Sequence, residues 1–232
     1  MLKLTMFAGV LLTALLVIGS AQASVCTITS PTFFASFTLN PSGTLGPGDC
    51  TSVVQQDKDY TNFAFTGLPT GTTVQFSFAV VFGEDVHTVT FLAPFGSTGA
   101  GASFNWSYDI SVVPGFTKLL RDVAVGVDQG RGTVTLAKDL VDNHGNHYSI
   151  NFTQVNPLSG PPTITGTTMA TFLPGVTSLT VADTLTIGSD GSNTSAVSNS
   201  YTQYVTPEPA SLALFGSGIL GLAGLLRRKK TL

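Results

Sequence analysis

Apolar and polar residues alternate with a period of two along several stretches of this chain. In the clearest stretch, Phe104, Trp106 and Tyr108 alternate with Asn105, Ser107 and Asp109. This pattern is typical of antiparallel strands that are buried on one face only. The same alternation occurs at 74–82, 148–153 and 179–187, where Asp183 interrupts the apolar face, and further strands are expected near 31–39, 60–66, 86–93, 119–127, 133–140, 163–172 and 197–205.

Turn signals separate these stretches, among them Pro114-Gly115, Asn143-His144-Gly145-Asn146 and Pro174-Gly175. They recur every 10 to 20 residues, and no long segment has the 3.6-residue period of a helix. The pattern therefore predicts an all-β domain, specifically an antiparallel two-sheet β-sandwich of jelly-roll type. Phenylalanine is the expected core filler, since the chain has 16 phenylalanines and one tryptophan.

The first 23 residues have the features of a secretory signal peptide. Lys3 precedes an apolar run from Leu4 to Ile18, and Ala21 and Ala23 place small residues before Ser24. We therefore expect the Sec machinery and signal peptidase as partners, with cleavage before Ser24. An uncleaved N-terminal anchor is the alternative.

The other end of the chain has three parts in a fixed order: Pro207-Glu208-Pro209, an apolar run over 210–226, and a basic group. The two prolines disfavour helix and keep the segment extended. The 17-residue run predicts a helix of about 25 Å, against a hydrocarbon core of about 30 Å. The basic group should stay cytoplasmic and leave the domain outside; its members are Arg227, Arg228, Lys229 and Lys230. A plain membrane anchor is the alternative interpretation.

This three-part tail resembles the PEP-CTERM sorting signal of exopolysaccharide-producing Gram-negative bacteria. The resemblance implies recognition by an exosortase, cleavage at or near 207–209, and delivery to the cell surface or extracellular matrix. It also implies only a transient stay in the cytoplasmic membrane. We therefore divide the chain into a signal peptide (1–23), a secreted β domain (24–203) and a sorting signal (204–232) that begins with the motif 207–211.

The segment between the two signals carries 12 acidic and 5 basic residues, a net charge of −7. A nucleic-acid-binding surface needs a basic patch, so nucleic acid is not an expected partner. Cys26 and Cys50 are the only cysteines. An even number of cysteines in an exported chain predicts one disulfide; metal ligation or a free nucleophile are the alternatives.

Candidate binding residues are few. Asp142, His144 and His147 form the densest polar cluster and are weak candidates for a metal site, although their sequence also suits a hairpin turn. Asp57 and Asp59 could contribute to a calcium site with Asp49, although two alternating acids on a strand edge are more often solvated. Tyr201 and Tyr204 are candidates for stacking on sugars. No cofactor is expected.

These observations predict a non-catalytic structural protein of a biofilm or exopolysaccharide matrix. A carbohydrate-binding, lectin-like module is the alternative. No serine or cysteine is placed as a nucleophile beside one of the three histidines. An enzyme would therefore need a site assembled from separate strands.

Overall fold

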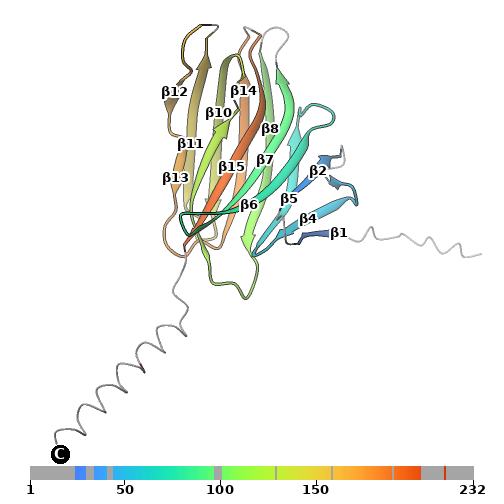
Figure 1. Cartoon of the computed structure of the whole chain (residues 1–232), viewed down its shortest axis with the longest axis vertical. Coiled ribbons are helices and arrows are strands. Elements are labelled where there is room, and N and C mark those ends of the chain that lie inside the picture. Colours follow the sequence, from blue (N-terminus) through green and yellow to red (C-terminus); the bar gives the residue numbers. More distant parts are fainter. Residues whose placement is uncertain are drawn as a thin grey trace, which may run out of the picture.

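The computed structural model describes residues 24–29, 34–40, 44–96, 101–128, 130–157, 159–189 and 191–204, together with Ser217. The described chain forms strands joined by turns (Figure 1). The strands are β1 (Ser24–Ile28), β2 (Ala35–Leu39), β3 (Leu45–Gly46), β4 (Cys50–Gln55), β5 (Lys58–Thr66), β6 (Thr73–Val81), β7 (Glu84–Gly96), β8 (Ala102–Val112), β9 (Leu119–Val127), β10 (Gly132–Asp142), β11 (His147–Asn156), β12 (Thr163–Gly166), β13 (Met169–Thr171), β14 (Ser178–Ile187) and β15 (Asn193–Tyr204). The all-β prediction is confirmed.

Hydrogen bonds link the strands into one sheet in the order β12-β11-β10-β14-β8-β5-β4-β3-β2-β6-β7-β15-β9-β13. All of these pairs are antiparallel, and β1 is added beside β4 as a parallel strand. The hydrogen bonds thus define one continuous sheet, and not the two separate sheets of the predicted sandwich.

The sheet curves so that its two halves face each other across the core (Figure 1). Side chains from β8 contact those from β7 and β15: the ring centroids of Phe91 and Trp106 are 4.9 Å apart, and the Tyr108 and Tyr201 hydroxyls are 2.7 Å apart. The alternating apolar residues of these strands therefore fill one shared core, as the period-two pattern requires.

The predicted strand at 163–172 is two strands at opposite edges of the sheet. β12 pairs with β11 at one edge, and β13 pairs with β9 at the other. The chain crosses after Gly166, whose φ of +111° favours glycine and where a Cβ atom would lie 2.2 Å from the Asn151 carbonyl oxygen. The two edges of the sheet are therefore covalently connected.

The structure describes no helix long and apolar enough to cross a bilayer within these residues. The predicted signal peptide and, except for Ser217, the predicted membrane helix at 210–226 lie outside the described residues.

Candidate functional site: the end of the domain where the chain leaves

The last strand, β15, carries polar residues on the face that points into the core. Asn199, Tyr201 and Gln203 alternate along it and are fully buried, in register with Val197. Asn199 donates to the Tyr108 hydroxyl (3.0 Å) and to Asp183 Oδ2 (3.3 Å). Buried polar groups require such partners, and those of Asn199 and Tyr201 fix β15 to β8 and β14 across the core.

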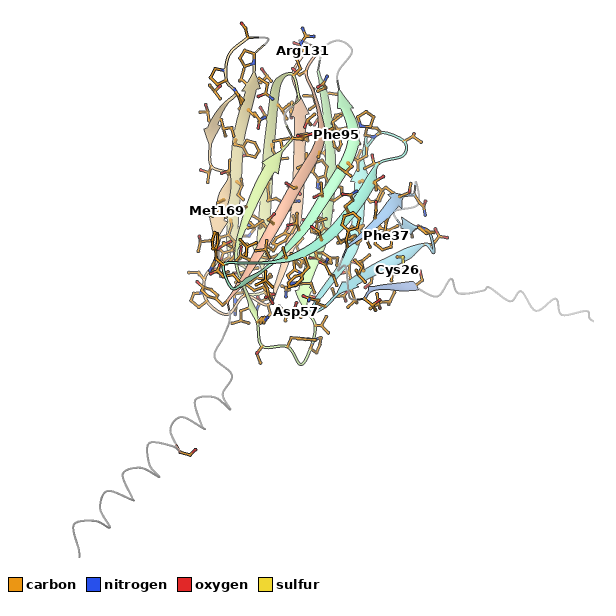
Figure 2. The ribbon with its side chains drawn as sticks, in the orientation of Figure 1. Cys26, Phe37, Asp57, Phe95, Arg131 and Met169 are labelled. Atoms are coloured by element: carbon orange, nitrogen blue, oxygen red, sulfur yellow. A yellow bond between two sulfur atoms is a disulfide. The ribbon has the colours of Figure 1, made fainter. Side chains whose placement is uncertain are left out.

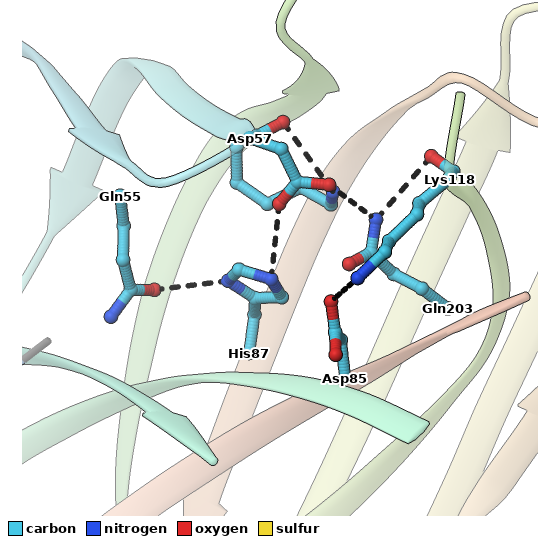
Figure 3. A network of polar contacts seen from close by, with 7 residues as sticks. Gln55, Asp57, Asp85, His87, Lys118 and Gln203 are labelled. Atoms are coloured by element: carbon cyan, nitrogen blue, oxygen red, sulfur yellow. Dashed lines mark hydrogen bonds and ion pairs between the residues drawn. The ribbon is translucent and has the colours of Figure 1, made fainter. Parts of the chain in front are cut away.

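Gln203 connects the end of β15 to a buried network of polar residues (Figure 3). Its Nε2 donates to Asp57 Oδ2 (2.9 Å) and to the Lys118 carbonyl oxygen (3.3 Å). Asp57 lies in the turn between β4 and β5, and Lys118 immediately precedes β9. One amide thus holds together three segments that are far apart in the sequence.

Asp57 is the centre of this network, which we call the exit network: Gln55, Asp57, Lys58, His87 and Gln203. Lys58 Nζ lies 2.9 Å from Asp57 Oδ2, and His87 Nε2 lies 3.2 Å from Asp57 Oδ1. His87 Nδ1 lies 3.2 Å from Gln55 Oε1. These five residues are all buried, so the network is sealed from solvent.

The electrostatics of the exit network favour an ionised Asp57 beside a neutral imidazole. Burial by itself raises the pKa of Asp57, but the hydrogen bond from His87 and the charge of Lys58 lower it well below its usual range. Burial lowers the pKa of Lys58 and of His87, against the opposing effect of Asp57. A carboxylate with several donors is stabilised in its charged form even when buried.

A second group of charges is more exposed, and two of its members, Lys118 and Asp85, lie beside the exit network (Figure 3). Lys118 pairs with Asp85, and the Arg121 guanidinium forms two parallel hydrogen bonds to Glu84, one of them 2.6 Å long. Arg121 also contacts Asp122 (2.6 Å) and lies over the Tyr204 ring, 5.8 Å from its centroid. The bonds to Glu84 and Asp122 raise the pKa of Arg121.

The acid–base groups of the exit network are closed to solvent. His87 and Lys58 have the groups of an acid–base site, but no part of either side chain reaches the surface. Among the described residues, no three His, Cys, Asp or Glu side chains are placed to hold a metal ion. The exit network therefore secures the end of β15.

The predicted Asp142 cluster is a hairpin turn in the structure. The Asp142 carboxylate accepts hydrogen bonds from the backbone N–H of His144 (2.8 Å) and of Asn146 (2.9 Å). It also accepts from the Asn146 amide and the Tyr148 hydroxyl, both at 2.9 Å. Burial raises the pKa of Asp142, but these four bonds together lower it to about 2. His144 and His147 are exposed. The hydrogen bonds of the Asp142 carboxylate therefore stabilise the hairpin turn.

Two other candidates need correction. Tyr201 is buried against Tyr108 and cannot stack on a sugar, whereas Tyr204 keeps part of its ring exposed beside Arg121. Asp57 is buried in the exit network and is not solvated; Asp59 accepts a hydrogen bond of 2.5 Å from Ser52. Because Asp57 points to Lys58 and His87, the two aspartates do not form the suggested calcium site.

The N-terminal end of the domain holds the predicted disulfide. Cys26 in β1 is bonded to Cys50 in β4, with their Cα atoms 5.6 Å apart (Figure 2). Ser24 is the first residue of β1, and its Oγ donates to the carbonyl oxygens of Gly48 (2.7 Å) and Asp49 (2.8 Å). Ala21 and Ala23 lie outside the described residues.

The sorting residues Pro207, Glu208, Pro209, Arg227, Arg228, Lys229 and Lys230 also lie outside them. What the structure adds is their point of attachment: β15 ends at Tyr204, three residues before Pro207. The protein is thus of the class in which a folded β domain directly precedes a C-terminal processing signal. Residues 205–229 match the PEP-CTERM protein-sorting motif. The chain therefore carries the signal of an exosortase-sorted extracellular protein. No curated protein matches the chain.

Sequence reasoning missed the exit network. Gln55, His87 and Gln203 were hidden because a polar residue in an alternating strand is ordinarily placed on the solvent side. One signal was present: Gln203 has the same parity in β15 as the apolar Val197, and so must point inwards.

Proposed function

We propose that this protein is exported by the Sec machinery, held briefly in the cytoplasmic membrane by a helix at 210–226, and cleaved by an exosortase within Pro207-Glu208-Pro209. The β domain then remains at the cell surface or in the extracellular matrix as a non-catalytic structural component. The observation that carries this proposal is the position of the sorting motif, which begins at Val205, directly after the last residue of β15.

The N-terminal end of the domain supports the proposed route. A disulfide is stable in the oxidising compartments outside the cytoplasm, and Cys26–Cys50 lies just after the predicted cleavage point. Ser24, the residue that would become the N-terminus, is already held by its two hydrogen bonds to the β3–β4 turn. Removal of residues 1–23 would therefore leave the described domain unchanged.

The non-catalytic role is supported by the use that the domain makes of its titratable groups. The buried histidine His87 and the buried lysines Lys58 and Lys138 each have an acidic partner inside the protein. Each of these side chains therefore takes part in an internal interaction that belongs to the folded structure. A structural role in an exopolysaccharide or biofilm matrix needs no exposed acid–base group, and the internal pairing of these three side chains supports the proposal.

The intact mass of the protein from the producing cells and from their medium tests this proposal. We expect a species that lacks residues 1–23 and the tail after about Pro209, lighter by two hydrogens because of the disulfide. A mature protein that keeps Leu212 to Leu232 and stays with membranes would instead establish a permanently anchored surface protein.

A matched pair of variants connects the result to the motif. Glu208→Ala with Pro207→Ala should keep the tail and accumulate in membranes. Pro161→Ala, which changes an exposed proline between β11 and β12, should be processed like the parent. Equal processing of both variants would show that cleavage does not depend on the Pro-Glu-Pro segment.

A carbohydrate-binding role is the second candidate, and a groove on the outer face of β5, β8 and β14 favours it. The groove has a volume of about 270 Å³ and is lined by Phe65, Asn105 and Thr184. An aromatic ring beside an amide and a hydroxyl is suitable for a sugar. A glycan array with the parent and with Phe65→Ala would decide, since binding that depends on Phe65 is required by this role.

A further inference from the structure

Exposed apolar side chains gather at the end of the domain from which the sorting signal leaves, which we call the exit end. The tip of the β6–β7 hairpin and two nearby loops contribute most of them. The set is Val80, Val81, Phe82, Phe116, Leu173 and Tyr204. By contrast, Val155 and Ile164 are exposed on β11 and β12 at the opposite end of the strands.

Several contacts show that these side chains belong to one end. Arg121 bonds to Glu84 at the start of β7 and lies over Tyr204. The Arg121 carbonyl oxygen accepts from the Phe172 N–H (2.7 Å), which places Leu173 next to it. Lys118, two residues after Phe116, pairs with Asp85. Figure 1 shows these loops at the same end of the sheet, the end where β15 finishes.

Phe82 is the most unusual member of this set. It is fully exposed, at 103%, and occupies the hairpin turn with a φ of 53°. Turn positions with positive φ favour Gly, Asn or Asp, and a bulky residue there is an outlier. An outlier that the local turn does not require is a reason to look for a function.

The length of chain between the domain and the predicted membrane helix limits how far this end can be from lipid. Five residues, 205–209, separate Tyr204 from Ala210. Even a fully extended chain covers at most about 20 Å over that distance. In the β7–β15 register, Thr202 pairs with Val86. Phe82 therefore lies about two residues beyond Tyr204, or roughly 7 Å nearer to the membrane.

We propose that the exit end of the domain is a membrane-contact surface that rests on the outer leaflet while the sorting signal is still in the bilayer. Phe82, Phe116 and Leu173 insert among the lipid headgroups and the upper acyl chains. This inference rests on the proposed function, because the helix at 210–226 brings the surface to the bilayer. Apolar side chains at such an interface bury to a depth of about 5–10 Å.

The charges at the exit end indicate that the contact is apolar and not electrostatic. Lys118 and Arg121 are already paired with Asp85, Glu84 and Asp122. These five residues have a net charge of −1 and offer no free basic patch to anionic lipid. Binding should therefore not weaken when salt is added, in contrast to a polybasic surface.

The test uses the full chain in protein-free vesicles of phosphatidylethanolamine and phosphatidylglycerol. Phe82→Trp places a fluorescent reporter at the exit end, and Ile164→Trp places a matched one at the opposite end. The parent, with Trp106 alone, gives the background. Lipids brominated near the headgroup end of the acyl chain should quench the reporter at position 82 and leave the one at 164 at the background level, at low and at high salt.

The outcomes separate the two proposals. A chain that floats with the vesicles but shows no quenching at position 82 would overturn the membrane-contact surface and leave the anchoring helix in place. Quenching at 82 only in membranes from the producing cells would also overturn it, and would point to a protein partner. A chain that does not float would overturn the proposed anchoring, and the contact surface with it.

A second variant separates membrane contact from folding. Phe82→Asn supplies the residue type that the turn prefers, and so should keep or raise the melting temperature. A Phe116→Trp reporter should nevertheless be quenched less when Phe82→Asn is added. Unchanged quenching at position 116 would show that Phe82 takes no part in the contact.

Discussion

The chain enters and leaves its β domain at two places that are held in different ways. β1 pairs with β4 alone among the described strands and is fixed there by the Cys26–Cys50 disulfide. β15 lies between β7 and β9 and is fixed by the exit network and by Asn199 and Tyr201. A peripheral strand has few hydrogen bonds to lose and gains most from a covalent bond. A central strand can instead be secured by buried polar groups.

The comparison also shows why the polar groups lie in the second half of β15. The strand extends to Tyr204, and the matched sorting motif begins at the next residue. An apolar face fixes which side of the strand is buried, but a shift by two residues would keep the same side buried. Asn199, Tyr201 and Gln203 are each hydrogen-bonded to particular residues, and so set the position of the strand along its own axis.

The largest effect should come from Asp57→Ala, which leaves Lys58 buried without its partner. Breaking a buried ion pair on one side costs about 3–5 kcal/mol of unfolding free energy, measurable by urea denaturation. Asp57→Leu combined with Lys58→Met should recover much of that loss, since no charge then remains buried. Asp139→Ala, at an exposed aspartate of β10, is the control. A loss below that of the control would contradict the role given to Asp57.

Removing the disulfide should have a somewhat smaller effect. The bond spans 24 positions in the sequence. The loss of this constraint on the unfolded chain costs about 3 kcal/mol in the chain-entropy model. We expect Cys26→Ser with Cys50→Ser to lower the urea midpoint accordingly and to expose β1 first in hydrogen exchange. If β15 exchanged before β1 in this variant, then β15 and not β1 would be the strand that depends on the disulfide.

Gln203→Leu should cost about 2 kcal/mol, because Asp57 loses one donor but keeps Lys58 and His87. The matched control is Thr202→Val, the preceding residue of the same strand, which is half-buried. Hydrogen exchange of β15 amides should rise in Gln203→Leu and not in the control. Equal hydrogen exchange of the β15 amides in the two variants would show that Gln203 does not stabilise the end of β15.

The smallest effect is a pH dependence from His87. Burial lowers the pKa of this imidazole, so the unfolded chain binds a proton below about pH 6.5 that the folded protein does not bind. Stability should therefore fall as the pH drops below about 6.5, by at most about 1.4 kcal/mol per pH unit for one proton. His87→Gln should remove this part of the profile, and His147→Gln, at an exposed histidine, should not.

Below about pH 4, the stability of the protein should depend on two carboxylates. The folded pKa is lowered for Asp57, and for Asp142 it is lowered to about 2. Each contribution is complete above about pH 4, the ordinary value for Asp, and is lost as the pH falls towards the folded pKa. A stability that stayed flat between pH 4 and pH 2 would contradict both assignments.

Much of the fold could be predicted from the sequence, because the signals involved are local. The alternation at 104–112 predicted β8 closely, and the even cysteine count predicted the disulfide. The division of 163–172 between two edges of the sheet could not be predicted, since it depends on which strands Gly166 and Met169 meet.

The exit network could not be predicted for the same reason. Asp57 and Gln203 are 146 residues apart, and their contact depends on the order and register of strands. Asp183 shows how much the sequence alone indicates: the alternation pattern identifies it as a polar residue on an apolar strand face. Its partner Lys138, whose Nζ lies 2.8 Å from Asp183 Oδ1, became identifiable only when β10 was placed beside β14.

The position of β15 between two other strands has a consequence for how the protein would respond to force. Its hydrogen bonds to β7 and β9 are perpendicular to the strand, and the strand ends at Tyr204 (Figure 1). Tension applied through the tail would therefore load both ladders in shear, so that many bonds must break together. Within the described sheet, the tail follows a strand that is hydrogen-bonded to a neighbour on each side.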